Sequence, residues 1–254
     1  MANLRLIARL DTKNENLIKG ISFEGLRVIG PLDEYSEKYY LNGADELLFM
    51  DAVASLYGRN HLSSFLTAAS KSIFVPVTAG GGITSLETVT EILRAGADKV
   101  AINTAAVKDP NLISAVADKF GSQAMVISID AKHNGNDWEV YIDNGREKTG
   151  IKVIDWAIIA CHRGAGEILL TSVDRDGTRK GFDVDLIKAV NDAVDIPVVA
   201  SGGMGTLEDF GNLALVESLS GIAIGSMLHY GLTSFPELRE YAAANKISVR
   251  EHEA

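Results

Sequence analysis

The feature that most constrains the fold of this chain is an internal repeat at a spacing of roughly 120 residues. Four sets of positions recur at intervals of 119 to 122 residues: Asp11 with Asp130, Glu46 with Glu167, Gly81-Gly82 with Gly202-Gly203, and Asn103-Thr104 with Gly225-Ser226. No linker separates the copies. The repeat predicts one domain over 1–254, built from two similar halves at about 1–122 and 123–254.

Short apolar runs and longer amphipathic runs alternate along the whole chain. The expected strands are 4–11, 46–51, 74–78, 98–102, 124–130, 166–172, 197–200 and 220–224. The expected helices are 33–43, 59–71, 84–95, 110–119, 152–164, 182–192, 206–217 and 235–244. Residues 131–149, with Asn144-Gly145, indicate a small hairpin inserted after the fifth strand.

Eight strand–helix units imply parallel strands with helical crossovers. An open, doubly wound sheet is the alternative, but it offers no reason for a repeat to return in register across eight strands. A chain of 254 residues suits a (β/α)8 TIM barrel, which typically takes about 250. We therefore expect an α/β protein with the (β/α)8 TIM-barrel fold and a two-fold half-barrel repeat.

Composition excludes several classes of protein. The net charge of −10 argues against a general binder of nucleic acid or of anionic membranes, since both select basic surfaces. A single cysteine, Cys161, fits a reducing cytoplasm. Arg5 and Arg9 interrupt the first apolar run, so no signal peptide is expected, and no run approaches the ~20 residues of a membrane helix. The histidines show no spacing typical of a metal site, and no cofactor is expected.

Polar residues gather where the expected strands end, and active sites of (β/α) barrels lie at those ends. Asp11, Asp51 and Asp130 each close a strand, and Asp174 and Asp176 follow the sixth. A strand-end aspartate is often only a helix cap or a turn residue. Asp11 and Asp130 differ from the others because they are repeat mates on opposite sides of one mouth. Two such carboxylates suit general acid–base chemistry.

Glycine-rich segments predict two phosphate sites. Gly80-Gly81-Gly82 and Asn103-Thr104 follow the third and fourth strands, and Gly202-Gly203 and Gly225-Ser226 follow the seventh and eighth. Glycines let backbone N–H groups approach a ligand closely, and such N–H groups with small hydroxyls commonly bind phosphate. Two symmetric sets predict a substrate with a phosphate at each end and its reacting centre between Asp11 and Asp130.

The chain resembles the cyclase subunit of imidazole glycerol phosphate synthase almost from end to end. The resemblance rests on LIKG around Lys19, FEGLR at 23–27, AGGGI at 79–83, GADKVAINTAAV at 96–107, FGSQ and SIDAK within 120–132, RGAGEILLTSVDRDGT at 163–178 and ASGG at 200–203. It implies a barrel enzyme of histidine biosynthesis. That enzyme uses ammonia from a partner glutaminase to convert a phosphoribulosyl-formimino aminoimidazole carboxamide ribonucleotide, a bisphosphate, into imidazole glycerol phosphate and aminoimidazole carboxamide ribotide.

The resemblance also implies roles for individual residues. Asp11 and Asp130 match the family's general acid and base, and Lys19 matches the lysine of its mobile loop. The matching phosphate residues are Gly82, Asn103 and Thr104 on one side, and Asp176, Gly177, Gly203, Gly225 and Ser226 on the other. The matching charges of the ammonia gate, at the N-terminal barrel face where the glutaminase docks, are Arg5, Glu46, Lys99 and Glu167. Asp98 and Gln123 match positions that meet the glutaminase. Without the resemblance, the four gate charges would be interpreted as an ordinary ion-pair plug.

Two features leave alternatives open. The loop with Lys19 and Arg27 is either a solvated surface loop or a lid whose cations meet the substrate. Arg9 stands where the family usually has a small residue, and strand alternation predicts that it projects into the barrel below Asp11. There it needs a carboxylate partner, and it could narrow the ammonia path or lower the pKa of a catalytic aspartate. The alternative function is therefore a paralogous barrel that passes ammonia to a sugar amidotransferase of surface-polysaccharide biosynthesis.

Overall fold

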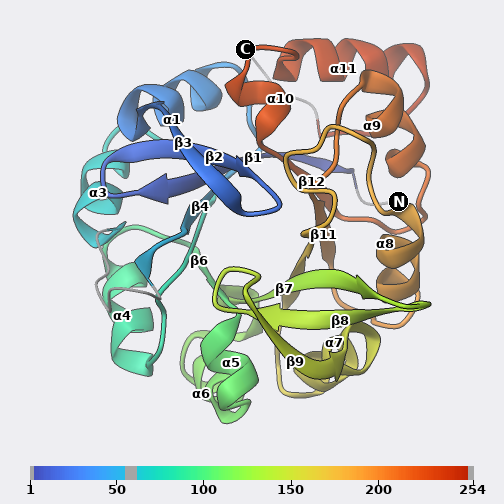
Figure 1. Ribbon diagram of the computed structural model, residues 1–254. Coiled ribbons are helices and arrows are strands. Elements are labelled where there is room, and N and C mark those ends of the chain that lie inside the picture. The colour runs from blue at the N-terminus through green and yellow to red at the C-terminus, as the bar shows by residue number, and fades with distance from the viewer. Residues whose placement is uncertain (1–2, 55–61, 251–254) are drawn as a thin grey trace.

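Eight parallel strands close into a barrel in the computed structural model, which describes residues 3–54 and 62–250 (Figure 1). The strands are β1 (Arg5–Lys13), β4 (Glu46–Asp51), β5 (Val77–Gly80), β6 (Lys99–Ile102), β7 (Met125–Asn134), β10 (Glu167–Ser172), β11 (Val198–Ser201) and β12 (Gly221–Ile224). They pair in the order β10-β11-β12-β1-β4-β5-β6-β7, and a further β10–β7 pairing closes the ring. The predicted (β/α)8 fold is confirmed.

Helices surround the barrel. The main ones are α1 (Leu32–Leu41), α3 (Leu62–Ala69), α4 (Leu86–Arg94), α6 (Asn111–Phe120), α7 (Val153–His162), α8 (Val184–Asn191), α9 (Leu207–Ala214) and α11 (Phe235–Ala244). Each lies within a predicted helix or differs from it by a residue at one end, although residues 59–61 of the second predicted helix lie outside the described residues. Sequence reasoning missed α5 (Thr104–Lys108), α10 (Ser226–His229) and the short 3₁₀ helix η1 (Ser122–Ala124). No described helix combines the length and the apolar character needed to cross a membrane.

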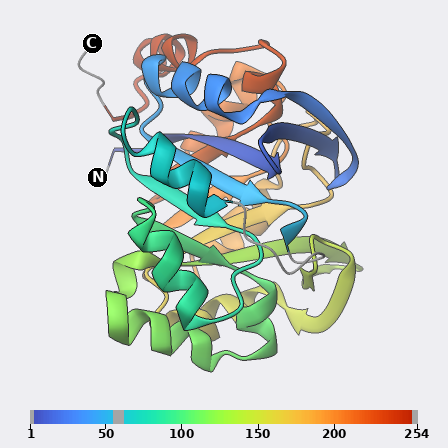
Figure 2. The same ribbon diagram turned by 90° about the vertical axis from the view of Figure 1, so that its left-hand side faces the viewer.

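Two β-hairpins stand on the C-terminal end of the barrel, opposite the chain termini (Figure 2). The first, β2 (Asn16–Ile21) and β3 (Glu24–Pro31), continues from β1, where the sequence predicted only a loop. The second, β8 (Asp137–Ile142) and β9 (Glu147–Lys152), continues from β7 and confirms the predicted insertion. The hairpins occupy corresponding places in the two halves, so both cover the mouth where the candidate site lies.

The barrel interior holds its own apolar layer, separate from the larger core between strands and helices. Its members all point inward from the strands and are almost fully buried: Ile7, Leu48, Ala101, Val126, Leu169, Val199 and Ala223. Because side chains alternate along a strand, the residues two positions earlier lie nearer the N-terminal face, and those two positions later lie nearer the mouth. The layer therefore separates the two ends of the barrel axis.

Backbone geometry follows the repeat closely. Asn103 has φ −117° and ψ −87°, and its repeat mate Gly225 has −116° and −85°. Each precedes a short helix, α5 or α10, after its strand. Gly81 and Gly202 share a positive φ, at 96° and 93°. These matched conformations place the two predicted phosphate segments at equivalent points of the mouth.

The two ends of the described chain lie side by side. Leu4 forms a parallel bridge with Val249, through hydrogen bonds of 3.0 Å from the Leu4 N–H to the Ser248 carbonyl and of 3.1 Å from the Arg250 N–H to the Leu4 carbonyl. This contact adds the segment after α11 to the N-terminal face of the barrel.

Candidate active site

The two predicted catalytic carboxylates lie on β1 and β7, where the hairpins begin. Asp11 and Asp130 are each 7% exposed. Their position on strands that pair on both sides fixes their backbone, so their chemistry is set by the side chains around them. Those surroundings differ strongly between the two halves.

Asp11 is held by two buried cations. Arg9 Nε donates to Asp11 Oδ1 at 3.0 Å, and Lys19 Nζ donates to Asp11 Oδ2 at 3.0 Å. Burial alone would raise the pKa of Asp11, but the charges of Arg9 and Lys19 outweigh it and hold this pKa well below its usual range. Asp11 is therefore a carboxylate at every physiological pH.

Asp130 has no such cation within hydrogen-bonding distance among the described residues. Its Oδ2 accepts a hydrogen bond of 2.9 Å from Asn103 Nδ2, whose other partner is the Tyr141 carbonyl at 3.0 Å. Burial raises the pKa of Asp130 to about 6, although the more distant charge of Arg9 partly opposes it. Asp130 can thus carry or release a proton near neutral pH.

Arg9 projects into the barrel as predicted, and its partner carboxylate is Asp11. Its Nη1 also donates to Thr171 Oγ1 at 2.8 Å and to Ser201 Oγ at 3.0 Å. The guanidinium thus reaches from β1 past β12 to side chains on β11 and β10. Its Cζ lies 5.5 Å from the centre of the Phe23 ring, which the first hairpin places against it. Arg9 is only 4% exposed.

Lys19 joins the first hairpin to the loop after β10. Its ammonium donates to both carboxylate oxygens of Asp176, at 3.0 and 2.8 Å, as well as to Asp11. The Ser22 N–H also donates to the Asp176 carbonyl at 2.8 Å. The segment is therefore a hairpin packed over the mouth with Lys19 buried, and it is not a solvated surface loop; whether its cations meet the substrate stays a prediction. Arg27, in contrast, is exposed and lies outside the site.

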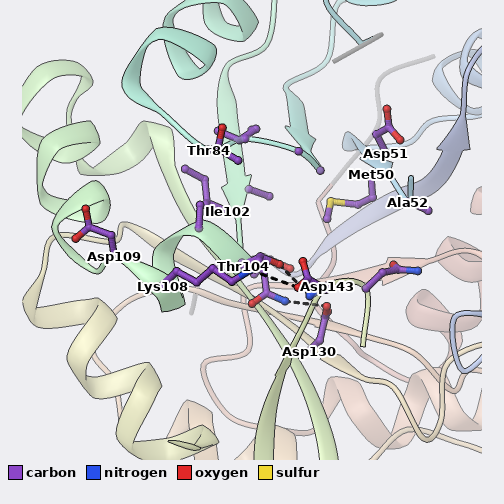
Figure 3. A pocket seen from close by; sticks show the side chains of 18 residues that line it. Met50, Asp51, Ala52, Thr84, Ile102, Thr104, Lys108, Asp109, Asp130 and Asp143 are labelled. Carbon is purple, nitrogen blue, oxygen red and sulfur yellow. Dashed lines mark hydrogen bonds and ion pairs between the residues drawn. The ribbon is translucent and has the colours of Figure 1, made fainter. Parts of the chain in front are cut away.

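A cavity of about 370 Å³ opens beside Asp130 (Figure 3). Gly82, Asn103 and Thr104 line it as predicted. Figure 3 shows Thr104, Asp143 and Asp130 along one side of this cavity, where the Asp143 N–H donates to Thr104 Oγ1 at 3.0 Å. A side chain at Gly82 could not fit, since its Cβ would lie 2.5 Å from that of Ala54. We call this space the first cradle.

The corresponding space in the other half is nearly filled. Its lining includes all the predicted residues of that side and Arg9: Arg9, Asp176, Gly177, Gly203, Gly225 and Ser226. We call it the second cradle, and its free volume is only about 20 Å³, roughly one water. Arg9 and the Lys19–Asp176 pair occupy the space between it and the axis. The structure thus brings the predicted residues together in two cradles of very different size.

The other strand-end aspartates have structural partners. Asp51 Oδ1 accepts from the N–H groups of Val53 and Ala54 at 3.0 and 2.9 Å, in the manner of a cap. Asp174 Oδ2 accepts from the His133 N–H at 2.7 Å and ties the end of β7 to the turn after β10. These contacts support the turn interpretation for both residues.

The four predicted gate charges form a closed ring at the N-terminal face. Arg5 pairs with Glu46 at 2.7 Å and with Glu167, and Lys99 bridges the same two carboxylates at 2.8 and 2.7 Å. Thr78 Oγ1 also donates to Glu46 at 2.6 Å. The ring lies below the apolar layer, because each member precedes a layer residue on its strand by two positions.

Sequence reasoning missed the hydroxyls inside the barrel. Ser128, Thr171 and Ser201 are buried at the same level as Arg9, and Thr78 lies at the level of the gate. The available signal was strand alternation, since Ser128 and Thr171 are spaced two or four positions from inward-facing acids on the same strands. Within 3–54 and 62–250, no group of three or more His, Cys, Asp or Glu side chains could hold a metal ion.

Comparison with known proteins identifies the family. Residues 5–234 match the family described as histidine biosynthesis protein. The chain is 60% identical over 211 residues to imidazole glycerol phosphate synthase subunit HisF of Legionella pneumophila, which covers 83% of this chain and all of that protein. It is 46% identical over 246 residues to the HisF subunit of Pyrococcus furiosus, covering 97% and 98% of the two chains. The chain belongs to the HisF family.

As a HisF, the protein is the cyclase subunit of imidazole glycerol phosphate synthase, an enzyme of histidine biosynthesis. The HisF subunit of Dehalococcoides mccartyi extends the likeness over nearly the whole chain, at 44% identity over 250 residues. The first of the two functions predicted from the sequence is thereby confirmed, together with the predicted class of enzyme.

Proposed function

We propose that this HisF closes the imidazole ring with Asp130 as general acid and Asp11 as general base, acting on a bisphosphate held in the two cradles. The substrate is the phosphoribulosyl-formimino aminoimidazole carboxamide ribonucleotide, and the second reactant is ammonia. The observation that carries the assignment is the contrast between repeat mates: one carboxylate is paired with two cations, and the other is buried beside an amide. Two titratable groups driven apart in pKa by their surroundings are the usual basis of separate acid and base roles.

Asp130 suits the acid role because its pKa of about 6 leaves a protonated fraction near neutral pH. Asn103 Nδ2 orients the carboxyl toward the first cradle, where it lines the cavity. A leaving oxygen or amine of the substrate could take its proton there.

Asp11 suits the base role because it is ionised, but its two cations make it a weak base as it stands. Lys19 belongs to the hairpin that covers the mouth, so it can move with that hairpin. When Lys19 turns to a substrate phosphate, Asp11 keeps only Arg9, and its pKa rises toward the ordinary value. Substrate binding would thus strengthen the base at the moment it is needed.

The same movement makes room for the second phosphate. In the second cradle, backbone N–H groups around Gly177, Gly203 and Ser226 suit a phosphate, but the space between them is small. Release of Lys19 from Asp176 would open this side, while the first cradle already has room for a phosphate and part of a base.

A partner glutaminase at the N-terminal face is the proposed source of ammonia. The ring of Arg5, Glu46, Lys99 and Glu167 closes the axis at that face, and Asp98 and Gln123 are exposed next to it. Large apolar side chains are also exposed at the end of α1 and on the loops that precede β5 and β12: Leu41, Phe74 and Leu215. Such side chains at one end of a barrel favour a protein partner.

The decisive test separates the cyclase from its partner. The purified chain should turn over the bisphosphate substrate with an ammonium salt as the nitrogen source, and imidazole glycerol phosphate should appear with the ribotide in equal amounts. Asp11→Asn should reduce kcat by about 10²- to 10⁴-fold, the usual contribution of general acid–base groups. An exposed carboxylate outside the site, Asp118→Asn, should retain wild-type turnover. Wild-type activity in the Asp11→Asn variant would show that Asp11 is not the general base.

A further inference from the structure

On the strands that carry the proposed catalytic aspartates, the two halves differ in charge at the inward-facing position two residues before each aspartate. Position 9 is an arginine, and its repeat mate 119 residues later, Ser128, is a small hydroxyl. Both lie two residues before a catalytic aspartate and face the barrel interior. The first cradle thus has a serine at its base where the second has a guanidinium.

The contacts of Arg9 leave one side of the guanidinium available. Nε is bonded to Asp11, and Nη1 is bonded to Thr171 and Ser201, so three hydrogen bonds fix the plane of the group. Among the described residues no hydrogen bond engages Nη2. Arg9 lines the second cradle together with the backbone segments at Gly177, Gly203 and Gly225.

We propose that Arg9 is a direct ligand of the phosphate that occupies the second cradle, so that this cradle is the anchoring end of the substrate. A guanidinium is the side chain best suited to a phosphate, since its planar N–H groups donate to two phosphate oxygens at once. Here the group is already oriented and desolvated, which reduces the entropy lost on binding. The inference rests on the proposed function, because it assumes a phosphate in that cradle.

Charge balance supports the same role. Two anions, Asp11 and Asp176, and two cations, Arg9 and Lys19, meet at this side of the mouth, so the cluster is neutral before a ligand arrives. The Asp176 carboxylate lies at the edge of the cradle and repels a phosphate dianion. Without Arg9 the cluster would carry a net negative charge. An arginine bound only to Asp11 would serve that carboxylate alone, but Arg9 also reaches Thr171 on β10 and Ser201 on β11, and Ser201 lines the cradle.

Titration with inorganic phosphate, followed by calorimetry, tests the proposal without any turnover. Wild-type protein should show a tighter and a weaker binding event. Arg9→Ser, which copies the residue of the other half, should weaken the tighter event at least tenfold, and Arg9→Lys should recover part of that loss because it keeps the charge without the fork. Gly203→Ala should remove the same event, since its Cβ would lie 2.3 Å from the Gly181 carbonyl oxygen.

Arg179→Ser is the matched control. Arg179 is exposed beside Tyr230, 5.9 Å from the ring centre, and it does not line the second cradle, so this variant removes the same charge from the same part of the molecule. It should bind phosphate like the wild type. Circular dichroism and thermal unfolding identify any variant that has lost its fold. If Arg9→Ser does not fold, phosphate binding by Arg9→Lys still tests the proposal.

Unchanged phosphate binding in folded Arg9→Ser would overturn the proposal, and so would equal losses in Arg9→Ser and Arg179→Ser. A wild-type protein that binds no phosphate at millimolar concentration would also overturn it. Ammonium-supported turnover by the wild type, measured separately, distinguishes these results from a failure of the proposed cyclase function.

Discussion

At the scale of single residues, the side chain two positions before each proposed catalytic aspartate sets the charge of the candidate site. Arg9 precedes Asp11, and Ser128 precedes Asp130. The repeat spacing was enough to predict both aspartates, and strand alternation was enough to place Arg9 inside the barrel. The difference in pKa between Asp11 and Asp130 could not be predicted from the sequence. It depends on the contact of Lys19, which lies on the first hairpin, with Asp11 and on the burial of Asp130.

Asp130→Asn should lower activity and raise stability at alkaline pH. The pKa of Asp130 is about 6 in the folded state and ~3.9 in the unfolded state. Asp130 therefore costs the folded wild type no stability below the unfolded value, and the folded state loses stability as the pH rises from there through the folded value. The difference between the two pKa values lowers the free energy of unfolding of the wild type by about 3 kcal/mol at most at pH 8. Asparagine cannot ionise and avoids this cost. Chemical denaturation of both proteins at pH 4.0 and at pH 8.0 should show a difference only at the higher pH.

The pH dependence of wild-type turnover gives a second measurement on the same residue. If Asp130 is the acid, kcat at saturating ammonia and substrate should fall as pH rises above about 6, because the protonated form disappears. A flat profile between pH 5 and pH 8, with Asp130→Asn inactive, would mean that Asp130 acts without donating its proton.

At the scale of elements, alternating apolar runs predicted every barrel strand, but the first hairpin was expected to be a loop. Its apolar side chains include the exposed Ile21 and Val28, so its sequence lacks the alternation of buried and exposed residues that predicts a strand. Its turn uses Ser22 and Phe23 at φ 50° and 64°, residues that rarely signal such a turn. The second hairpin turns at Asn144-Gly145, the typical sequence, and was recognised. The strand expected at 74–78 begins later, at Val77, because Phe74 is apolar but exposed.

Gly177→Ala should detach the first hairpin from the second cradle. Gly177 has φ +72°, and an added Cβ would lie 2.3 Å from the Gly20 carbonyl oxygen on β2. The variant combines backbone strain of about 1–3 kcal/mol with a clash against the element that carries Lys19. We expect a KM for the bisphosphate at least tenfold higher with ammonium as nitrogen source.

Gly25→Ala separates the clash from the strain. Gly25 has a similar φ of +61°, but nothing lies within 4 Å of its Cβ position. This variant should lose stability yet bind the substrate nearly as well as the wild type. Equal KM values for the two variants would show that the hairpin contact at Gly20 has no part in substrate binding.

At the scale of the whole molecule, the charged ring and the mouth with the candidate active site lie at opposite ends of one axis, with the apolar layer of Ile7 and its neighbours between them. Topology and the closed barrel followed from the repeat and the strand count. The interpretation of the four charges as a gate came only from the family resemblance and stays a prediction, because four charges of balanced sign look the same whether they plug a barrel floor or control a passage.

Arg5→Ala should affect turnover differently with the two sources of nitrogen. Ammonium-supported turnover should stay close to the wild-type value, since the mouth is untouched, whereas glutamine-supported turnover with the partner glutaminase should fall by about tenfold. Stability should drop by about 2 kcal/mol, less than the ~3–5 kcal/mol of a fully buried pair, because Arg5 is partly exposed. Arg94→Ala, on the exposed end of α4, is the charge-matched control. Equal loss with both nitrogen sources would assign the ring a structural role only.

Leu4 and Val249 are paired neighbours, so the order of the two halves along the chain can be reversed by joining these ends. A short linker joining these neighbouring ends would turn the chain into a closed loop, and a new opening at 121–124, between α6 and β7, would start the chain with its second half. Every strand would keep its neighbours in such a circular permutant. We expect it to fold and to retain ammonium-supported turnover, as near-ultraviolet circular dichroism and the cyclase assay can establish. The permutant would begin with the half that carries Ser128 and end with the half that carries Arg9.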